Sequence, residues 1–564
     1  MLKGHPKGLI VFFFANMGER FGYYTMIAIF VLFLQAKYGF SYATASQYYG
    51  IFLAAVYFLP LLGGFISDKW LGYGKTVSLG MIIMFVGYLM LALPTSIDVG
   101  SMTSGLPLVV GGLAVISLGT GLFKGNLQVL VGNLYDDPKY SSNRDVAFNI
   151  FYMGINVGAM FAPTAAEEIS NWILGKHGFT YSPDIPALAH KYLAGDASVI
   201  QKLTEFAQQQ GANIADLNAF SFNYINALAE SYHWAFGVAC ISLIVSMIVF
   251  WAFRKLYKDA DMTEAQKAAS EEHKDKVIEL TPEQTKQRFI ALGLVFFVVI
   301  FFWMAFHQNG AAMTAFARDY TQDTIGKFTN IFFDLWGLLS IFLAVIGLII
   351  FFKAKDSKYK IISLIGMVAF AIIAYFRIDG YTDVNSFSPQ KFQHFNPFFI
   401  VALTPVIVGL FAMLRKNGKE PSAPKKIGIG MLITAIAFAI MIIGSLSLSS
   451  VSPGIIGEQR APLDFLVSPY WLIATYFTLT IAELFLSPMG ISFVSKVSPP
   501  KYKGLMQGGW FAATAIGNYA VAIVAYFWDQ IPLWGFWAIL VVCCLLSAAF
   551  IFTVLKRLER AANS

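Results

Sequence analysis

The sequence predicts an all-α integral membrane protein with about fourteen membrane-spanning helices. Of the 564 residues, 57% are hydrophobic and only 13% are charged, whereas soluble domains are roughly 25% charged. The mean hydropathy is +0.62. The apolar residues also gather in runs of about 20, the length at which a helix crosses the hydrocarbon core of a bilayer.

Apolar runs separated by short polar loops are the candidates for these helices. Their number is even, so both termini are expected on the same side of the membrane. The fourteen runs lie near 8–35, 48–67, 76–94, 106–130, 146–163, 232–253, 289–308, 330–352, 360–377, 396–414, 427–447, 470–492, 506–527 and 533–555.

The basic residues predict the orientation. With the N-terminus in the cytoplasm, 29 of the 40 Lys and Arg residues fall in inside loops and nine in outside loops. An excess of this kind marks cytoplasmic loops. We therefore predict a multi-pass protein of the plasma membrane, the inner membrane of a bacterium, with cytoplasmic N- and C-termini.

The net charge of +7 comes mainly from these loops, so it indicates membrane topology and no nucleic-acid partner. Cys240, Cys543 and Cys544 lie within apolar runs and lack metal-ligand spacing, and we expect them to be core residues and predict no metal site. The first apolar run is too long for a cleaved signal peptide and lacks a small-residue cleavage site. It is therefore expected to be a membrane span.

Polar segments divide the chain into two halves. A charge-rich stretch at 257–288 predicts a cytoplasmic linker helix between an N-terminal bundle, 1–256, and a C-terminal bundle, 289–564. Six runs precede the linker and eight follow it. Two bundles of six helices, with an additional transmembrane hairpin at 330–377, are the simplest account. Residues 164–231 are expected to form an insert on the outside.

The first run carries all its polarity on one stripe. Asn16, Glu19, Arg20, Tyr23 and Tyr24 are spaced three and four residues apart, so they share a helix face. A charged side chain at the bilayer centre costs roughly 2.5–3.5 kcal/mol on insertion scales. Such a stripe is therefore expected to face the interior of the bundle or an aqueous cavity, either as a binding wall or as a pair that locks two helices.

Two further charges are isolated within apolar runs. Lys124 needs an acidic partner, and Glu19 is the nearest candidate by depth. Glu483 is the only charge of its run, so unpaired it would be protonated or would meet a cationic ligand. One half thus presents Arg20 and Lys124, and the other presents Glu483. A zwitterion fits a cavity between them.

Several motifs carry a family resemblance that covers nearly the whole chain. "NMGERFGYYTM" resembles the first-span motif Glu-x-x-Glu-Arg-Phe-x-Tyr-Tyr of the proton-dependent oligopeptide transporter (POT/PTR) family, within the major facilitator superfamily. "GGFISDKWLGYGKTV", "GLFKGN" and "FNIFYMGINVGAMFAP" resemble its loop after span two and its motifs in spans four and five. "FWMAFHQNGAAMT", "AELFLSPMG" and "GGWFAATAIGNY" resemble spans seven, ten and eleven.

The resemblance implies proton-coupled import of di- and tripeptides by alternating access, in a monomer with no cofactor besides the coupling protons. It implies the major facilitator fold, two six-helix bundles plus the hairpin. Arg20 and Lys124 would hold the peptide carboxylate, and Glu483 would meet the peptide amino terminus. Other residues expected to line the cavity are Tyr23, Tyr24, Tyr57, Asn156 and Trp510.

The sequence departs from the family pattern at Asn16, His307 and Gly125, where the motifs carry Glu, an acid and Pro. The hairpin also follows span seven, whereas bacterial members tend to carry it between spans six and seven. Because Asn16 is neutral, Glu19 is expected to be held ionised by two bases. His307 can take protons instead, or can be a cavity residue without a role in coupling. The candidates for proton coupling are Glu19, Lys124, His307 and Glu483.

Asp68 lies at a helix end beside Lys69 and Lys75. Charge–dipole and ion-pair contacts there can hold the cytoplasmic side closed, which makes Asp68 and Lys75 candidate gating residues. A positive loop that only fixes topology is the alternative.

Other functions remain open at this stage. A carrier of the same fold for nitrate, another anion or a peptide-like drug would use Arg20, Lys124 and His307, although Glu483 would repel a simple anion. A peptide facilitator with weakened proton coupling is a further alternative. Nothing supports an enzyme, since the sequence has no nucleophile elbow, metal-ligand cluster or P-loop.

Overall fold

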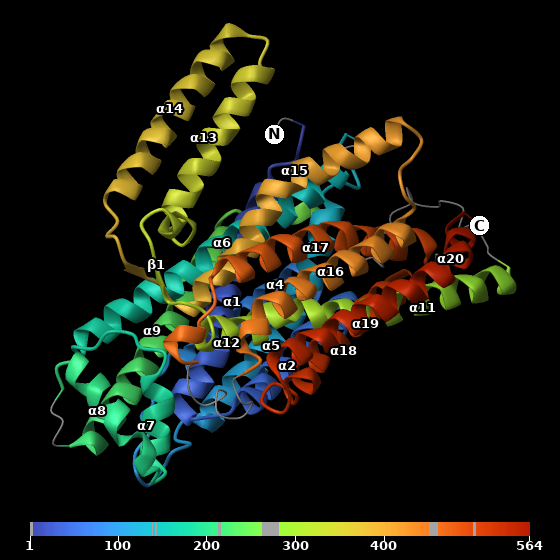
Figure 1. Cartoon of the computed structure of the whole chain (residues 1–564). Coiled ribbons are helices and arrows are strands. Elements are labelled where there is room, and N and C mark those ends of the chain that lie inside the picture. Colours follow the sequence, from blue (N-terminus) through green and yellow to red (C-terminus); the bar gives the residue numbers. More distant parts are fainter. Residues whose placement is uncertain are drawn as a thin grey trace.

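The computed structural model describes residues 4–137, 139–140, 144–212, 216–261, 281–450, 461–499 and 503–563. Most of the linker expected at 257–288 lies outside the described residues. The described part is a bundle of long helices with one helical hairpin standing apart (Figure 1).

The N-terminal helices precede residue 262. They are α1 (Gly8–Tyr38), α2 (Tyr42–Phe58), α3 (Pro60–Ile66), α4 (Tyr73–Ala92), α5 (Leu106–Asn133), α6 (Arg144–Lys176), α7 (Ile185–Leu193), α8 (Ile200–Gln209) and α9 (Leu217–Ala252).

The C-terminal helices follow residue 281. They are α11 (Pro282–Phe306), α12 (Ala312–Asp319), α13 (Leu335–Lys353), α14 (Ser357–Asp379), α15 (Phe395–Lys416), α16 (Ala423–Ser445), α17 (Tyr470–Val497), α18 (Lys503–Ala525), α19 (Leu533–Thr553) and α20 (Leu555–Asn563).

Thirteen helices of the described chain are long and apolar enough to cross a membrane. They match thirteen of the fourteen predicted spans. The remaining run, 146–163, lies in α6, a continuous helix that contains Pro163 and extends into the polar stretch after residue 164. α6 nevertheless packs along α1 and α9.

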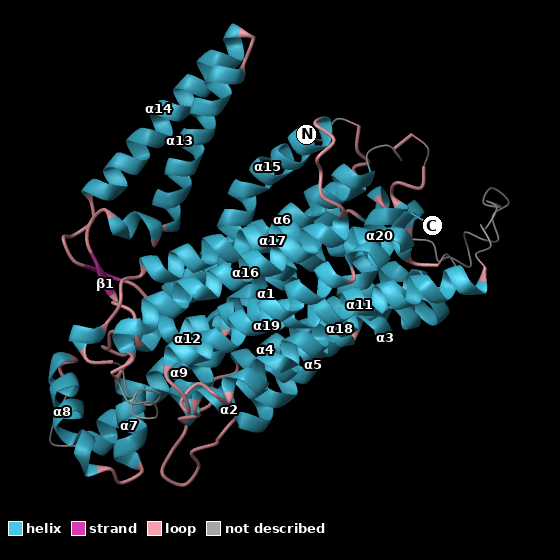
Figure 2. Ribbon diagram, turned by 45° about the vertical axis from the view of Figure 1, so that its right-hand side comes forward, coloured by secondary structure: helices cyan, strands magenta, loops and turns pink. Residues whose placement is uncertain are grey.

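The helices pack mainly within each half of the chain. α1 packs against α6 and α9, and α4 packs against α5; in the other half α16 packs against α17 and α19. The halves meet where α2 lies against α18 and where α6 lies against α15. In both ribbon views the two termini lie at the end of the bundle opposite α7 and α8 (Figures 1 and 2).

The insert expected at 164–231 is shorter than the sequence suggested. α6 continues to Lys176 and α9 begins at Leu217. Only the segment between them, with α7 and α8, lies outside the long helices. α7 packs on α1 and α9, and Nε2 of His190 lies 2.9 Å from the carbonyl oxygen of Ala36. The insert therefore covers the end of α1.

The hairpin of α13 and α14 is fixed at its base. β1 (Thr324–Ile325) and β2 (Asn385–Ser386) pair there as antiparallel strands. Nη2 of Arg377 lies 2.5 Å from Asp334, and the Tyr381 hydroxyl also donates to Asp334. Beyond this base the two helices diverge from the bundle, as both views show (Figures 1 and 2).

Glycines bring α4 and α5 into close contact. A Cβ at Gly119 would lie 2.6 Å from the backbone nitrogen of Met84 and 2.7 Å from the carbonyl oxygen of Gly80. Both are α4 backbone atoms, so they have little freedom to yield. Small residues allow this approach of helix backbones in membrane proteins.

We predict that Gly119→Ala lowers the thermal unfolding midpoint of the detergent-solubilised protein. Overpacking costs roughly 1–3 kcal/mol, which exceeds the gain of about 1 kcal/mol in helix propensity. The control is Gly293→Ala in α11, where a Cβ would meet nothing within 4 Å and the midpoint should rise. Circular dichroism during heating measures the unfolding midpoints of both variants. A higher midpoint in both would contradict the packing argument.

Candidate functional site

The buried charges of α1 form a pair between adjacent residues. Nε and Nη2 of Arg20 each donate to a different oxygen of Glu19, both at 2.5 Å. The two side chains are almost fully buried. The guanidinium also lies 4.5 Å from the centre of the Tyr23 ring. Both oxygens of Glu19 are thus occupied by Arg20. Nδ2 of Asn16 makes a long hydrogen bond, 3.5 Å, to the carbonyl oxygen of Phe151.

Lys124 has a different partner from the one the sequence suggested. Within the described residues its ammonium group has no carboxylate within 4.0 Å, so the expected ion pair with Glu19 is not formed. Instead Nζ lies 3.5 Å from the centre of the Tyr57 ring and 6.0 Å from that of Phe511. A cation over an aromatic face is stabilised by the ring quadrupole. The charge itself stays available to an anion.

His307 continues this aromatic cluster. Its ring stacks on Trp303 at 5.1 Å and meets the Tyr57 ring edge-on at 6.1 Å. The cluster therefore joins α5, α2 and α11 through Lys124, Tyr57 and His307. Nδ1 of His307 is buried without a hydrogen-bond partner in the described part of the chain.

Glu483 in α17 is the acidic end of the site. Nδ2 of Asn396 donates to its Oε2 at 2.9 Å and to Oγ1 of Thr480 at 3.1 Å. The hydroxyl of Tyr152 donates to Oε1 of Glu483 at 3.3 Å. Tyr152 belongs to α6 of the other half, so this hydrogen bond crosses between the halves. Glu483 is buried.

Tyr152 and Asn396 were missed by the sequence analysis. Tyr152 lies one helical turn before Asn156, whose Nδ2 donates to the Tyr152 carbonyl oxygen at 3.1 Å. This spacing was available from the sequence, because Tyr152 is part of "FNIFYMGIN". Asn396 begins α15, and no pattern in the sequence distinguishes it from other loop asparagines.

The tyrosines lie between the two ends of the site. The ring of Tyr57 lies under the Lys124 ammonium group, and Tyr23 meets Tyr24 edge-on at 5.2 Å. Trp510 is buried, and its indole occupies the space where a side chain at Gly490 would lie. Tyrosines thus contact the charged groups of both halves: Tyr23 contacts Arg20, Tyr57 contacts Lys124, and Tyr152 contacts Glu483.

The segment around Asp68 contains no ion pair of Asp68 in the described structure. Asp68 accepts a hydrogen bond from the Tyr73 hydroxyl at 2.6 Å, and Nζ of Lys69 lies over the rings of Phe65 and Trp70. Asp68 and Lys75 are exposed. The expected ion pairs of Asp68 with Lys69 and Lys75 are thus replaced by a hydrogen bond.

Polar contacts between the halves gather instead at the end covered by α7. Nη1 of Arg318 donates to Oε1 of Gln35 at 2.7 Å. Nζ of Lys391 lies 2.7 Å from Oε2 of Glu167, and the backbone N–H of Ser388 donates to Oε1 of Glu167 at 2.9 Å. Glu167 and Lys391 are both largely buried. The sequence analysis named none of these residues.

The chain resembles known proteins along most of its length. It is 28% identical over 549 residues to peptide transporter YePEPT of Yersinia enterocolitica, covering 92% of this chain and 88% of the relative. It is 26% identical over 528 residues to dipeptide and tripeptide permease A of Escherichia coli, covering 92% and 85%.

A solved structure shares the fold. A POT family transporter in complex with 5-aminolevulinic acid matches with a TM-score of 0.66 and 18% identity, covering 99% of this chain and 98% of the other. The model of the POT family itself matches residues 74–271 and 376–536, more than half of the chain. The chain therefore belongs to the POT family.

Proposed function

We propose that this transporter imports di- and tripeptides together with protons, by alternating access of a site between its two halves. The observation that carries the proposal is the arrangement of charges. Arg20 and Lys124 lie on one half, Glu483 lies on the other, and Lys124 lacks a carboxylate partner in the described structure. The relatives named peptide transporter and dipeptide and tripeptide permease support the same substrate class.

A bound peptide would use its two charged ends. Its carboxylate would lie against Lys124 and Arg20, where it competes with Glu19 for the guanidinium. Its ammonium group would lie against Glu483 and replace the weaker hydrogen bond from Tyr152. Because both contacts involve only backbone termini, peptides with different side chains would fit.

Proton coupling would follow from the same competition. A carboxylate that loses its guanidinium partner holds a proton more readily. When substrate draws Arg20 away, Glu19 is left to accept a proton, and Lys124, His307 and Glu483 are the other groups that can exchange protons here. Asn16, which cannot titrate, would make the coupling weaker.

The contacts at the α7 end would form the outer gate. In the proposed cycle the pairs Glu167–Lys391 and Gln35–Arg318 close the extracytoplasmic side and must break when the site opens outward. Asp68 and Lys75 would act at the cytoplasmic side. We propose a monomer in a bacterial inner membrane, with both termini in the cytoplasm.

Uptake of labelled dialanine into proteoliposomes tests the substrate and the role of Glu483. An inward proton gradient should drive accumulation that excess tripeptide blocks. Glu483→Gln should lower uptake at least about tenfold, because a hydrogen bond to a charged group contributes roughly 1.5–3 kcal/mol. Glu205→Gln, the same change in exposed α8, is the control. Near-normal uptake by Glu483→Gln would show that Glu483 does not bind the peptide ammonium group. Nitrate uptake without peptide uptake would favour an anion carrier.

The coupling role of position 16 has its own test. We expect Asn16→Glu to raise the accumulation ratio of dialanine under a fixed proton gradient, because the site gains a second acid. Asn16→Gln, which keeps the position neutral, should leave the ratio unchanged. Equal ratios in both variants would mean that the missing acid does not limit coupling.

The outer gate is tested by the accessibility of Ala28, a buried α1 residue whose carbonyl oxygen accepts from Gln393. In an Ala28→Cys background, Lys391→Gln should increase labelling by an impermeant maleimide at least about tenfold, because breaking a buried ion pair is strongly destabilising.

Two further variants control this experiment. Lys327→Gln removes the Lys327–Asp379 ion pair at the hairpin base and should not change labelling. Lys391→Arg, which keeps the positive charge facing Glu167 and leaves the Ser388 hydrogen bond in place, should keep labelling slow. Equal labelling of Lys391→Gln and Lys327→Gln would exclude the gate.

A further inference from the structure

The turn between α13 and α14 concentrates positive charge far from the transport site. Residues 353–360 hold Lys353, Lys355, Lys358 and Lys360 against one aspartate, a net charge of +3. All four lysines are exposed. None of them has a carboxylate within 4.0 Å among the residues that the structure describes, so their charges are available to a ligand.

The single aspartate of this turn, Asp356, already accepts a hydrogen bond from the backbone. Oδ1 of Asp356 accepts a hydrogen bond from the backbone N–H of Lys358 at 2.9 Å, which caps the start of α14. Side chains that cap a helix in this way satisfy its free N–H groups. Asp356 therefore fixes the turn and does not neutralise the lysines by direct contact.

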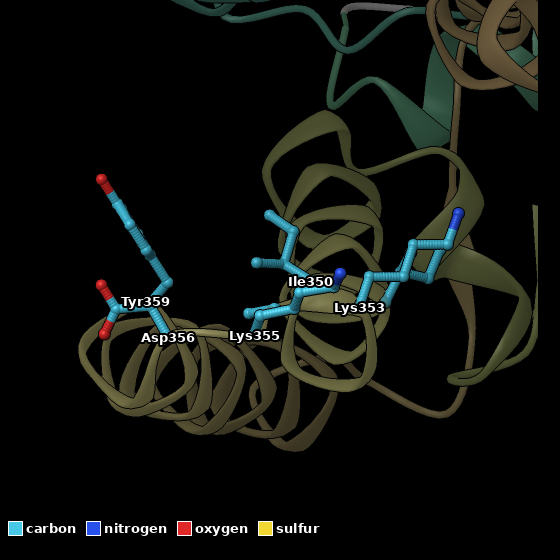
Figure 3. Close-up of a pocket in the computed structure, with 7 residues that line it drawn as sticks. Ile350, Lys353, Lys355, Asp356 and Tyr359 are labelled. Carbon is cyan, nitrogen blue, oxygen red and sulfur yellow. The ribbon is translucent and has the colours of Figure 1, made fainter.

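A recess lies beside these charges. It has a volume of about 460 Å³ and is lined at one side by Ile349, Ile350 and Lys353 and at the other by Lys355, Asp356 and Tyr359. In Figure 3 the side chains of Tyr359 and Asp356 lie apart from those of Ile350 and Lys355, and the side chain of Lys353 extends beyond Ile350, away from Tyr359. Its surface is thus mainly apolar, and the charged residues Lys353, Lys355 and Asp356 border it.

The surroundings indicate where the recess sits in the membrane. The flanks of both helices expose large apolar side chains, among them Phe352, Ile361 and Ile365. Such a surface belongs in hydrocarbon. The turn points toward the end of the molecule that holds both termini (Figures 1 and 2). The lysines therefore lie where the hydrocarbon gives way to the headgroup layer on that side.

We propose that the α13–α14 turn binds the headgroup of an anionic phospholipid, with an acyl chain along the apolar wall of the recess. Clusters of lysines directly beside a membrane span attract anionic lipids. A lipid accounts for both parts of the site, because its phosphate would meet the lysines while its acyl chain follows Ile349 and Ile350; a free phosphate would use the lysines alone. The proposal is independent of the transported substrate.

Native mass spectrometry of the full-length detergent-solubilised protein tests the proposal. Phosphatidylglycerol and phosphatidylcholine with identical acyl chains are the probes. We expect phosphatidylglycerol to be retained preferentially, and Lys353→Gln with Lys355→Gln to reduce its retention, by about fivefold for each lysine removed. The control is Lys176→Gln with Lys202→Gln, the same charge change on exposed lysines at the α7 end of the molecule, which should leave retention unchanged.

Hydrogen exchange gives a second, local measurement on the unaltered chain. In nanodiscs, phosphatidylglycerol should slow amide exchange within 353–360 relative to phosphatidylcholine. Equal retention of the two lipids, an equal loss in the control variant, or unchanged exchange would each overturn the proposal. Displacement of phosphatidylglycerol by an equal concentration of inorganic phosphate would also overturn it, in favour of a free-anion site.

Discussion

The ion pair between Glu19 and Arg20 is the constraint on which the rest of the site depends. Charges within a membrane need partners, and here two adjacent residues form a two-point ion pair with each other. Lys124 consequently lies over the ring face of Tyr57. Glu483 accepts hydrogen bonds from neutral side chains of α15 and α6. The first span thus holds a compensated pair, while the two remaining charges are held by groups that a ligand can replace.

Much of this arrangement could be predicted from the sequence. The lengths of the apolar runs predicted the long helices. The spacing of the polar residues between 16 and 24 predicted that they share one face of α1. The prediction that Glu19 pairs with Lys124 was wrong, because two residues at the same depth in the membrane need not have side chains that point toward each other. Asn396 was missed because it is neutral, and its role depends on packing of α15 against α17. Glu167 and Lys391 are 224 positions apart, so no local pattern could join them.

The two ends of the protein are closed by different kinds of contact. At the α7 end the halves are joined by buried ionic and amide contacts, whereas Asp68 at the other end hydrogen-bonds within its own loop. A buried ion pair between the halves is costly to break, whereas the hydrogen bond between Asp68 and Tyr73 lies within one half and does not join the two. The structure described here is therefore held more firmly on the α7 side.

The closed base of the α13–α14 hairpin makes this segment suited to insertion or removal during evolution. Since β1 and β2 pair, the chain leaves the bundle and returns to it at neighbouring points. A segment whose ends adjoin can be inserted or removed without displacing what it interrupts. The range that the family model leaves unmatched, 272–375, contains most of the hairpin together with α11 and α12. The hairpin thus has the properties of an accessory module that joins the helices around the site at a single place.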